Sequence, residues 1–482
     1  MKVELNKDNS SEAKNSSELK TDEKTAASSS SMRKKNTVDM TVGNPIRHIL
    51  LFAAPLLVGN LFQQFYNLVD SIIVGKYINA DALAATGCCA SLNFLFFSLC
   101  FGLANGIGVI VSQYFGSGNH AKIKETVASA IYVVCGTALV VTLLGVVLAR
   151  PLLILMKAPE GIIRDEAVVY FRTTCCGILF IGVYNGIAAI LRALGDSKTP
   201  LVFLIISSFL NIGMDLLFVI VFDLGVFGVA FATVVAQFIS AAISLIYACA
   251  KVPYFKLSRA EIKPHPTIIK HSFRLGVPLA LQSSMIAISM IVLQGVVNSF
   301  GNVAMSANTI TSKVDLIVSQ FYNAMASAIT TFSGQNFGAN KIDRVKKGYK
   351  YGIIFTCLYN LIMIPIVYFL SPHIVSIFVD EAAVIELGIK AERILCFMYA
   401  ALGLIYIPRG VLNGVGDARF SLINGISEVI CRLVYSFALT SIAFIGQMGI
   451  WWAGGLTWVT VAIICNSRYL IGKWQNLSAI RR

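Results

Sequence analysis

The sequence is poor in charged residues. Asp, Glu, Lys and Arg make up 13% of its 482 residues, whereas soluble domains carry about 25%. Long apolar segments recur between residues 49 and 471, and the mean hydropathy is +0.73. The alternating segments of about ten residues that are typical of membrane β-barrels do not occur. These features exclude a soluble globular protein and predict an all-α polytopic membrane protein.

Motifs of enzymes and cofactor sites are also missing. None of the five histidines falls in the middle of an apolar segment, which excludes a histidine proton relay there. The 11 cysteines form no CxxC pair, so we expect neither a disulfide framework nor a cysteine metal site. HExxH, GxSxG and P-loop motifs are absent. We therefore expect a protein that is not an enzyme and binds no cofactor.

The positive charge is unevenly placed along the chain. The formal net charge is +14, and Lys and Arg gather in the loops 251–270 and 334–347. Neither residue occurs in the loops expected on the opposite side, 223–225, 300–302, 371–385 and 445–449. Only 149–166 departs from this positive-inside bias, which places both termini in the cytoplasm. We predict a multi-pass protein of the cell (inner) membrane whose partner is the lipid bilayer, not nucleic acid.

Twelve apolar segments are long enough to cross a bilayer, which takes about 20 residues. They are 49–76, 82–112, 125–148, 167–190, 201–222, 226–249, 271–299, 303–333, 348–370, 386–408, 420–444 and 450–471. The polar residues 1–43 read as a disordered cytoplasmic tail. We expect an N-terminal six-helix lobe in 44–250, a cytoplasmic linker in 251–270, and a C-terminal six-helix lobe with a short tail in 271–482.

The chain repeats itself at an interval of 221 to 223 residues. SQYFG at 112–116 returns as GQNFG at 334–338, and LRALGD at 191–196 returns as LNGVGD at 412–417. Six helices are an even number, so the two halves run parallel and are related by a pseudo-two-fold axis along the membrane normal. Pro55 returns as Pro278, and this recurrence inside two spans favours a helix bend that is retained in both halves.

Asp70 and Asp215 are acidic residues deep inside apolar segments of the first half. A carboxylate at membrane depth is costly and usually faces a cavity or a partner. Asn211 and Asp215 are four residues apart and share one helix face. Both aspartates fall in the outer part of spans that run outward, so they can meet. A carboxylate pair of this kind titrates as a unit, although Asp215 could instead make a helix-packing hydrogen bond.

The second half carries a different set of charges. No acid stands at the position that matches Asp70. Glu428 and Arg432 are four residues apart on the eleventh span, and Lys313 and Asp315 lie on the eighth. Charges buried in a membrane pair by necessity, so these residues form either two structural pairs or a cluster for binding or gating.

Several of these motifs resemble the multidrug and toxic compound extrusion family, and in particular its DinF-like prokaryotic branch. The likeness rests on Pro55, NLVD at 67–70, the SQYFG and LRALGD motifs, and the Asn211/Asp215 pair, and it covers roughly residues 44–472. It implies a site in the N-terminal half at Asp70, Tyr170, Asn211, Asp215 and Thr233. The coupling ion would be H⁺ or Na⁺, and Na⁺ would bind at Asp70, Asn211 and Asp215. The NorM-like branch has a Glu on the seventh helix, where this chain reads PLALQSS.

The resemblance implies an antiporter that exports amphipathic, often cationic, small molecules by rocking of two lobes, and we expect a monomer. One alternative is a flippase for a lipid-linked precursor, which should have a cationic central cavity. We expect Lys313 and Arg432 to be balanced by Asp315 and Glu428, which argues against it. The other alternative is a membrane-embedded enzyme or receptor, which the missing motifs and the internal repeat disfavour.

Overall fold

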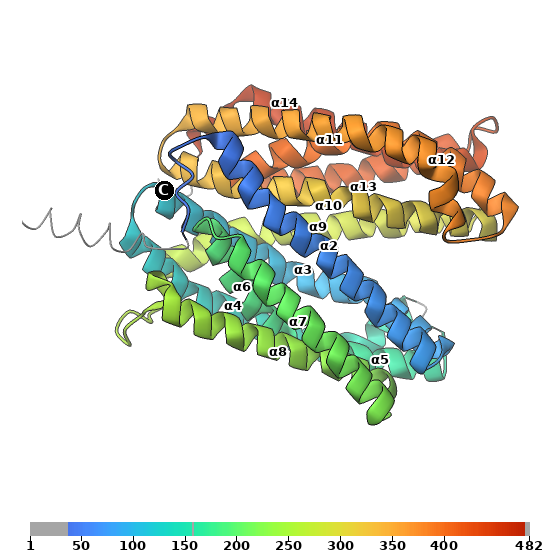
Figure 1. Cartoon of the computed structure of the whole chain (residues 1–482), viewed down its shortest axis with the longest axis horizontal. Coiled ribbons are helices and arrows are strands. Elements are labelled where there is room, and N and C mark those ends of the chain that lie inside the picture. Colours follow the sequence, from blue (N-terminus) through green and yellow to red (C-terminus); the bar gives the residue numbers. More distant parts are fainter. Residues whose placement is uncertain (1–36, 157–158, 478–482) are drawn as a thin grey trace, which may run out of the picture. The chain divides into compact units, whose positions relative to one another are not determined.

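The computed structural model describes residues 37–156 and 159–477, and this part of the chain folds into helices without strands. The helices of the first half are α2 (Pro45–Tyr77), α3 (Ala80–Gly116), α4 (His120–Leu155), α5 (Ile162–Cys176), α6 (Ile178–Ala193), α7 (Lys198–Leu216) and α8 (Gly225–Lys251). Those of the second half are α9 (Pro266–Asn298), α10 (Asn302–Gly338), α11 (Ile342–Ser376), α12 (Ala382–Val415), α13 (Ala418–Thr440) and α14 (Gly449–Ile471). Within residues 39–482, the second half lies above the first in Figure 1.

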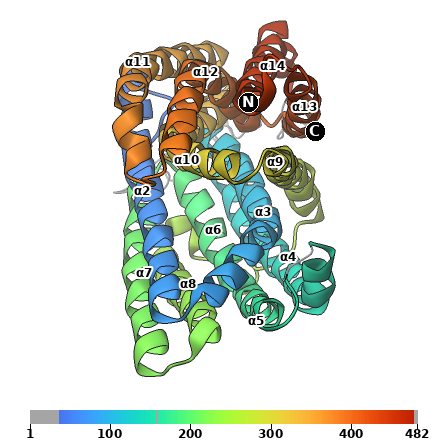
Figure 2. The ribbon, with the colours of Figure 1, turned by 90° about the vertical axis from the view of Figure 1, so that its right-hand side faces the viewer.

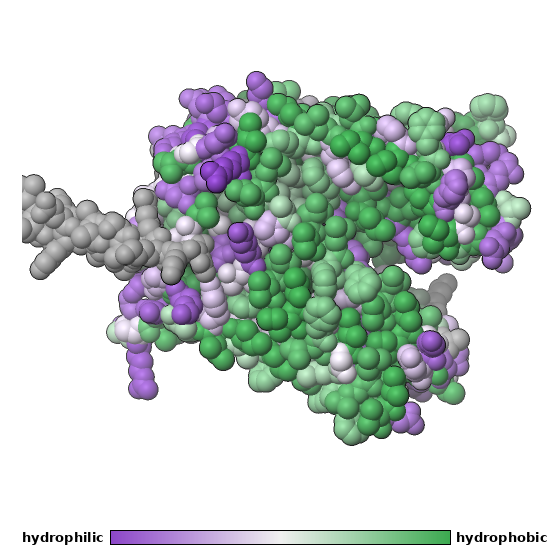
Figure 3. Space-filling view, in the orientation of Figure 1, coloured by the Kyte–Doolittle hydropathy of each residue, from purple (hydrophilic) through white to green (hydrophobic). Residues whose placement is uncertain are grey.

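The prediction of twelve spans corresponds to twelve helical segments. Ten helices of the described part are long and apolar enough to cross a membrane, and α5 with α6 makes an eleventh, bent by 44°. The remaining segment, α10, has 37 residues but is richer in Ser, Thr, Asn and Gln. Hydrophobic side chains cover the middle of the molecule in Figure 3, and hydrophilic ones gather at its two ends. This surface matches a bilayer that surrounds the bundle.

The first helix of each half begins in the core of the other half. Ile49 and Phe52 near the start of α2 are buried among residues of α10 to α14, whereas Ile73 near its end packs with α7 and α8. Figure 1 shows α2 crossing from one half to the other. In the same way, Leu275 of α9 is buried among residues of α3, α4 and α6. The sequence halves 44–250 and 271–482 therefore exchange their first helices at one end.

Small residues allow α3 and α9 to pack closely. A methyl group built on Gly106 would come within 2.7 Å of the backbone nitrogen of Gly276, and one on Gly102 would overlap Ala280. Figure 2 shows α9 beside α3 in the middle of the molecule. Pro278 lies inside α9 and Pro55 inside α2, and both helices continue through their proline.

The repeated motifs meet each other at the pseudo-two-fold axis. Gln113 Nε2 donates a hydrogen bond of 2.9 Å to Gly414 O, and Gln335 Nε2 donates one of 2.9 Å to Ala193 O. A methyl group on Gly116 would overlap Gln335 O, and one on Gly338 would overlap Gln113 O. We call this contact between the ends of α3 and α10 the crossing point. SQYFG and GQNFG supply the glutamines and glycines of this contact, and LRALGD and LNGVGD supply the accepting carbonyl groups. This explains why the two pairs of motifs repeat together.

Residues 39–43 are held against the second half. Met40 is buried, and its backbone nitrogen donates to Gln335 Oε1 at 2.8 Å. The guanidinium of Arg344 donates to the carbonyl oxygens of Gly43, at 3.0 Å, and Met40, at 2.9 Å. The prediction of a disordered tail up to residue 43 therefore does not fit these five residues, because α10 and α11 supply their hydrogen-bond partners. Most of the predicted tail, 1–36, lies outside the described residues.

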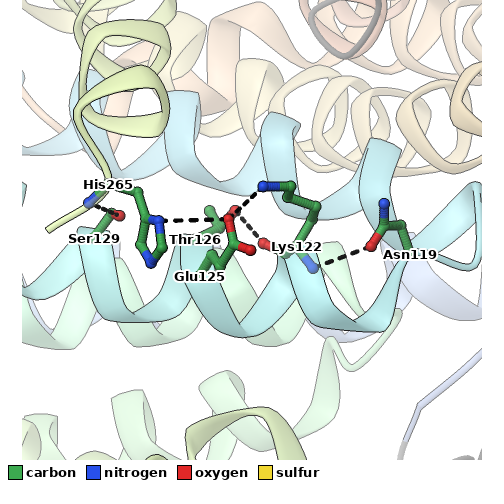
Figure 4. A network of polar contacts seen from close by, with 6 residues as sticks. All are labelled: Asn119, Lys122, Glu125, Thr126, Ser129 and His265. Atoms are coloured by element: carbon green, nitrogen blue, oxygen red, sulfur yellow. Dashed lines mark hydrogen bonds and ion pairs between the residues drawn. The ribbon is translucent and has the colours of Figure 1, made fainter. Parts of the chain in front are cut away.

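The connector between the halves lies along α4. Figure 4 shows His265, whose backbone nitrogen donates to Ser129 Oγ at 3.2 Å and whose Nδ1 is 3.6 Å from Glu125 Oε2. Lys122 Nζ lies 2.6 Å from the same oxygen. Farther along, the backbone N–H of Ser258 and then Lys124 stabilise the charged form of Glu261, which lowers its pKa to about 2. The connector is thus fixed to the first half by polar contacts.

The crossing point should tolerate no added side chain. We expect Gly338→Ala to lower the free energy of unfolding by about 1–3 kcal/mol, because overpacking forces the backbone apart. The control is Gly136→Ala in α4, where a new methyl group meets nothing within 4 Å. Thermal unfolding of both purified variants in detergent measures the difference. Equal midpoints for the two variants would show that the crossing point can relax without cost.

Candidate functional site

Five predicted residues of the first half come together where α2, α5, α7 and α8 meet. Asp70 lies two turns before the end of α2, and Asp215 lies at the end of α7. The two carboxyl groups lie near each other, and Tyr170 of α5 lies near both. Asn211 Nδ2 donates to Thr233 Oγ1 of α8 at 3.5 Å. Valine and isoleucine side chains of α2, α7 and α8 enclose this site.

The site holds acceptor oxygens without matching donors. Four of these atoms are buried and have no hydrogen-bond partner: Asp70 Oδ1, Asp215 Oδ1, Asp215 Oδ2 and Asn211 Oδ1. Two carboxylates accept hydrogen bonds but donate none, so Asp70 and Asp215 can bond to each other only when one of them carries a proton. Such a group of unpaired buried acceptors is stable only with a proton or a bound cation.

Two further features of this site were not predicted. Tyr66 stands one helical turn before Asp70 and lies near both carboxyl groups; its i, i+4 spacing from Asp70 was the available signal. A π-helix, η1 (Leu217–Val221), directly follows α7, two residues after Asp215. π-helical turns occur frequently at functional sites, but sequence periodicity does not reveal them.

A separate cavity lies between the two halves. Its volume is about 590 Å³, and α3, α6, α9, α10, α12, α13 and α14 contribute to its lining. None of the five predicted residues of the first-half site is among the described residues that line it. The lining includes Asn105, Gln282, Asn308, Tyr406 and Trp458. The molecule thus has an acidic site inside the first half and a central cavity between the halves.

Glu428 joins two arginines at the wall of the central cavity. Its Oε1 lies 3.4 Å from Arg432 Nη2, and its Oε2 lies 3.7 Å from Arg409 Nη2. Side-chain exposure is 8% for Glu428, 12% for Arg409 and 2% for Arg432, so this is a buried triad. Arg409 was not predicted, because it stands one residue beyond the tenth predicted span, 386–408.

Lys313 does not belong to this group. Its Nζ lies 5.3 Å from the centre of the Phe378 ring, and the side chain is exposed. Lys313 and Asp315 are two residues apart, and residues with this spacing do not face each other on a helix. In the expected balance of Lys313 and Arg432 against Asp315 and Glu428, Arg432 does contact Glu428, but Lys313 takes no part. The arginines that line the cavity are Arg192, Arg409 and Arg432.

One acid beside the predicted Asp315 was also missed. Tyr399 donates a 2.6 Å hydrogen bond to Asp315 Oδ1. Glu392 of α12 lies near both residues, is fully buried, and has two carboxylate oxygens without a partner. Glu392 stands inside the span predicted at 386–408, but near its outer end, and was not counted among the deep acids. No group of three or more His, Cys, Asp or Glu in the described chain could hold a metal ion.

Comparison with known protein families shows to which family the chain belongs. A family model described as MatE matches residues 55–217 and 278–438, one stretch in each half. The chain belongs to the MatE family. The predicted resemblance to multidrug and toxic compound extrusion proteins is thereby confirmed, and the chain is a multi-pass membrane transporter of this family.

Relatives of known name cover most of the chain. It is 28% identical over 439 residues to the probable multidrug resistance protein YpnP of Bacillus subtilis, which covers 91% of this chain and 97% of YpnP. It is 22% identical over 444 residues to the probable multidrug resistance protein NorM of Thermotoga maritima, covering 90% and 94% of the two chains. The match to the multidrug export protein MepA of Staphylococcus aureus (strain NCTC 8325 / PS 47) is 21% over 410 residues, covering 83% and 88%.

Solved MATE structures share the fold. An outward-facing multidrug resistance MATE family transporter of the MOP superfamily has a TM-score of 0.83 at 21% identity, covering 92% of this chain and 100% of the other. A MOP superfamily transporter from Pyrococcus furiosus, described as having a binding pocket of reverse polarity, has a TM-score of 0.85 at 22% identity with the same coverage. The predicted all-α, twelve-helix, two-lobe fold is confirmed.

The triad should behave as one electrostatic unit in this MatE protein. We expect Glu428→Gln to destabilise it by about 3–5 kcal/mol, because two buried arginines then lack an acid. Arg432→Gln should cost less, since Glu428 keeps Arg409. The double variant should cost at least about 0.5 kcal/mol less than the sum of the singles. Denaturant unfolding in detergent micelles measures all three.

The exposed pair Glu386 and Lys390, 2.7 Å apart, is the control. Exposed ion pairs contribute little, so its single and double Gln variants should be close to neutral. Additive losses at Glu428 and Arg432 would mean that the two charges act independently.

Proposed function

We propose that this protein is a secondary antiporter that exports amphipathic small molecules in exchange for H⁺ or Na⁺ bound at Asp70 and Asp215. The observation that carries the proposal is the group of four buried acceptor oxygens without donors on Asp70, Asn211 and Asp215. A carboxylate oxygen can take a proton, and carboxylate and amide oxygens are hard ligands of the kind that suit Na⁺.

The substrate would bind in the central cavity. Its volume of about 590 Å³ lies in the range of about 300–1,000 Å³ that holds drug-sized molecules. Its lining mixes aromatic side chains such as Trp451 and Trp458 with amides such as Asn105 and Asn308. This mixture suits molecules with both apolar and polar parts.

Transport would follow from rocking of the two halves around this cavity. One elementary charge that moves through 100 mV supplies about 2.3 kcal/mol, which supports roughly a 50-fold gradient of a neutral substrate. We further propose that both termini are cytoplasmic, that the protein resides in the cell (inner) membrane, and that it works as a monomer with the DinF-like site arrangement.

The flippase alternative has one observation in its favour. Three arginines line the central cavity against two acids, whereas a balanced set was expected. A cavity of about 590 Å³ is suited to a drug-sized molecule, which favours the antiporter over a carrier of a lipid-linked precursor.

Everted membrane vesicles test the proposal directly. Dye movement should be driven by a proton gradient or by a sodium gradient when each is imposed separately. Movement with one gradient alone identifies the coupling ion. Dye transport that is independent of both gradients would overturn the proposed antiport.

Removal of one carboxylate should uncouple transport without unfolding the protein. We expect Asp70→Asn to abolish gradient-driven efflux, because the pair can no longer exchange a charge. The new amide can donate to Asp215, so expression and thermal stability should persist. Asp165→Asn is the control, since Asp165 is exposed and pairs with exposed Arg150 at 3.7 Å. Wild-type efflux by well-expressed Asp70→Asn would remove Asp70 from the coupling role.

Antiport also predicts a pH-dependent affinity. Protonation of the carboxylate pair must weaken substrate binding by the same factor by which substrate weakens proton binding. The dissociation constant of a permanently charged rhodamine ethyl ester should therefore rise from pH 8 to pH 5 in wild type and rise less in Asp215→Asn, where only Asp70 can bind a proton. Fluorescence titration in detergent measures both. A flat profile in wild type would exclude linkage through this pair.

A further inference from the structure

Arg192 is a cation without a partner at the inner surface of the central cavity. It lies in the last turn of α6, is partly exposed, and lines the cavity. Its guanidinium makes no hydrogen bond or ion pair with any described residue. A guanidinium inside a membrane protein that lacks a counter-charge is costly. This makes Arg192 different from Arg409 and Arg432, which share Glu428.

The acids of the cavity are already engaged elsewhere. Glu428 contacts Arg409 and Arg432, and Asp315 accepts a hydrogen bond from Tyr399. The cavity therefore presents three arginines against two acids, and the unmatched positive charge is located at Arg192. At the position of the second half that corresponds to Arg192 stands Asn413, which also lines the cavity.

We propose that Arg192 is the binding site for an anionic group, a carboxylate, on the amphipathic substrate. This inference rests on the proposed transport function and replaces the cationic preference that the family resemblance implies. A guanidinium binds a carboxylate through two parallel hydrogen bonds, and the apolar part of the substrate would contact Phe94 and the tryptophans of the lining.

The location of Arg192 also couples the substrate to the crossing point. The next residue, Ala193, accepts the hydrogen bond from Gln335 that holds the two halves together. A carboxylate on Arg192 would therefore lie one residue from a contact between the two halves. Arg192, the proposed substrate-binding residue, and Ala193, which accepts the hydrogen bond at the crossing point, thus lie in the same turn of α6.

Two dyes that differ in one charge test the inference. A rhodamine with a free carboxylate and its ethyl ester are titrated at pH 7 into purified wild type, Arg192→Gln, Arg192→Lys and Arg419→Gln. Arg419 is an exposed arginine of α13 and serves as the matched control. We expect wild type to bind the carboxylate dye about tenfold more tightly than the ester, the effect of one charge-assisted hydrogen bond.

The three variants show whether the preference for the carboxylate dye depends on the positive charge at position 192 or on a general change in the structure. Arg192→Gln should bind both dyes about equally, Arg192→Lys should keep part of the preference because it keeps the charge, and Arg419→Gln should match wild type. Binding of the ester as tight as that of the carboxylate in wild type would overturn the inference, as would a preference that persists in Arg192→Gln.

Transport of the ester in everted vesicles distinguishes the two proposals. Gradient-driven export of the ester by wild type, together with no carboxylate preference, would leave the antiporter intact and refute only the role of Arg192. A carboxylate preference that disappears in Arg192→Gln supports that role even if neither gradient drives export, a result that would refute the antiport alone.

Discussion

The crossing of α3 and α10 is the contact on which the arrangement of the two halves depends. Inside a bilayer no water is available for unpaired amides, so buried polar side chains must find partners in the protein. Gln113 and Gln335 meet this requirement by donating to carbonyl groups of the opposite half. Gly116 and Gly338 allow this approach because any side chain would overlap the facing backbone. Ala193, which accepts the bond from Gln335, also lines the central cavity, so the contact holds the backbone next to Arg192.

Much of this architecture could be predicted from the sequence. The spans follow from hydrophobic length, and the two-fold relation follows from the repeated motifs. The meeting of Asp70 and Asp215 follows from helix direction and depth. Exchange of the first helices could not be predicted, because hydropathy shows that α2 is apolar but not which core it enters. The contact of Arg409 with Glu428 could not be predicted either. The two residues lie on different helices, and sequence spacing reveals only partners on the same helix.

The two halves have diverged in charge while their backbones kept the same plan. The first half concentrates unpaired acceptor oxygens at Asp70 and Asp215, away from the cavity. The second half directs Glu428, Arg409 and Arg432 to the cavity wall. Arg192 in the first half corresponds to the neutral Asn413 in the second. A symmetric scaffold thus carries an asymmetric field, with the unpaired acceptor oxygens in one half and most of the cavity charge in the other.

The course of α2 through both cores has a mechanical consequence. Its first turns are buried in the second half with Ile49 and Phe52, and its last turns are buried in the first half with Ile73 and Val74. Pro55 stands between these two segments, three residues after Phe52. A rotation that parts the halves must therefore bend, slide or release this helix, and Asp70 is attached to its far arm. Under such a rotation the angle between the halves and the surroundings of the Asp70 carboxylate would change together, because both depend on this one helix.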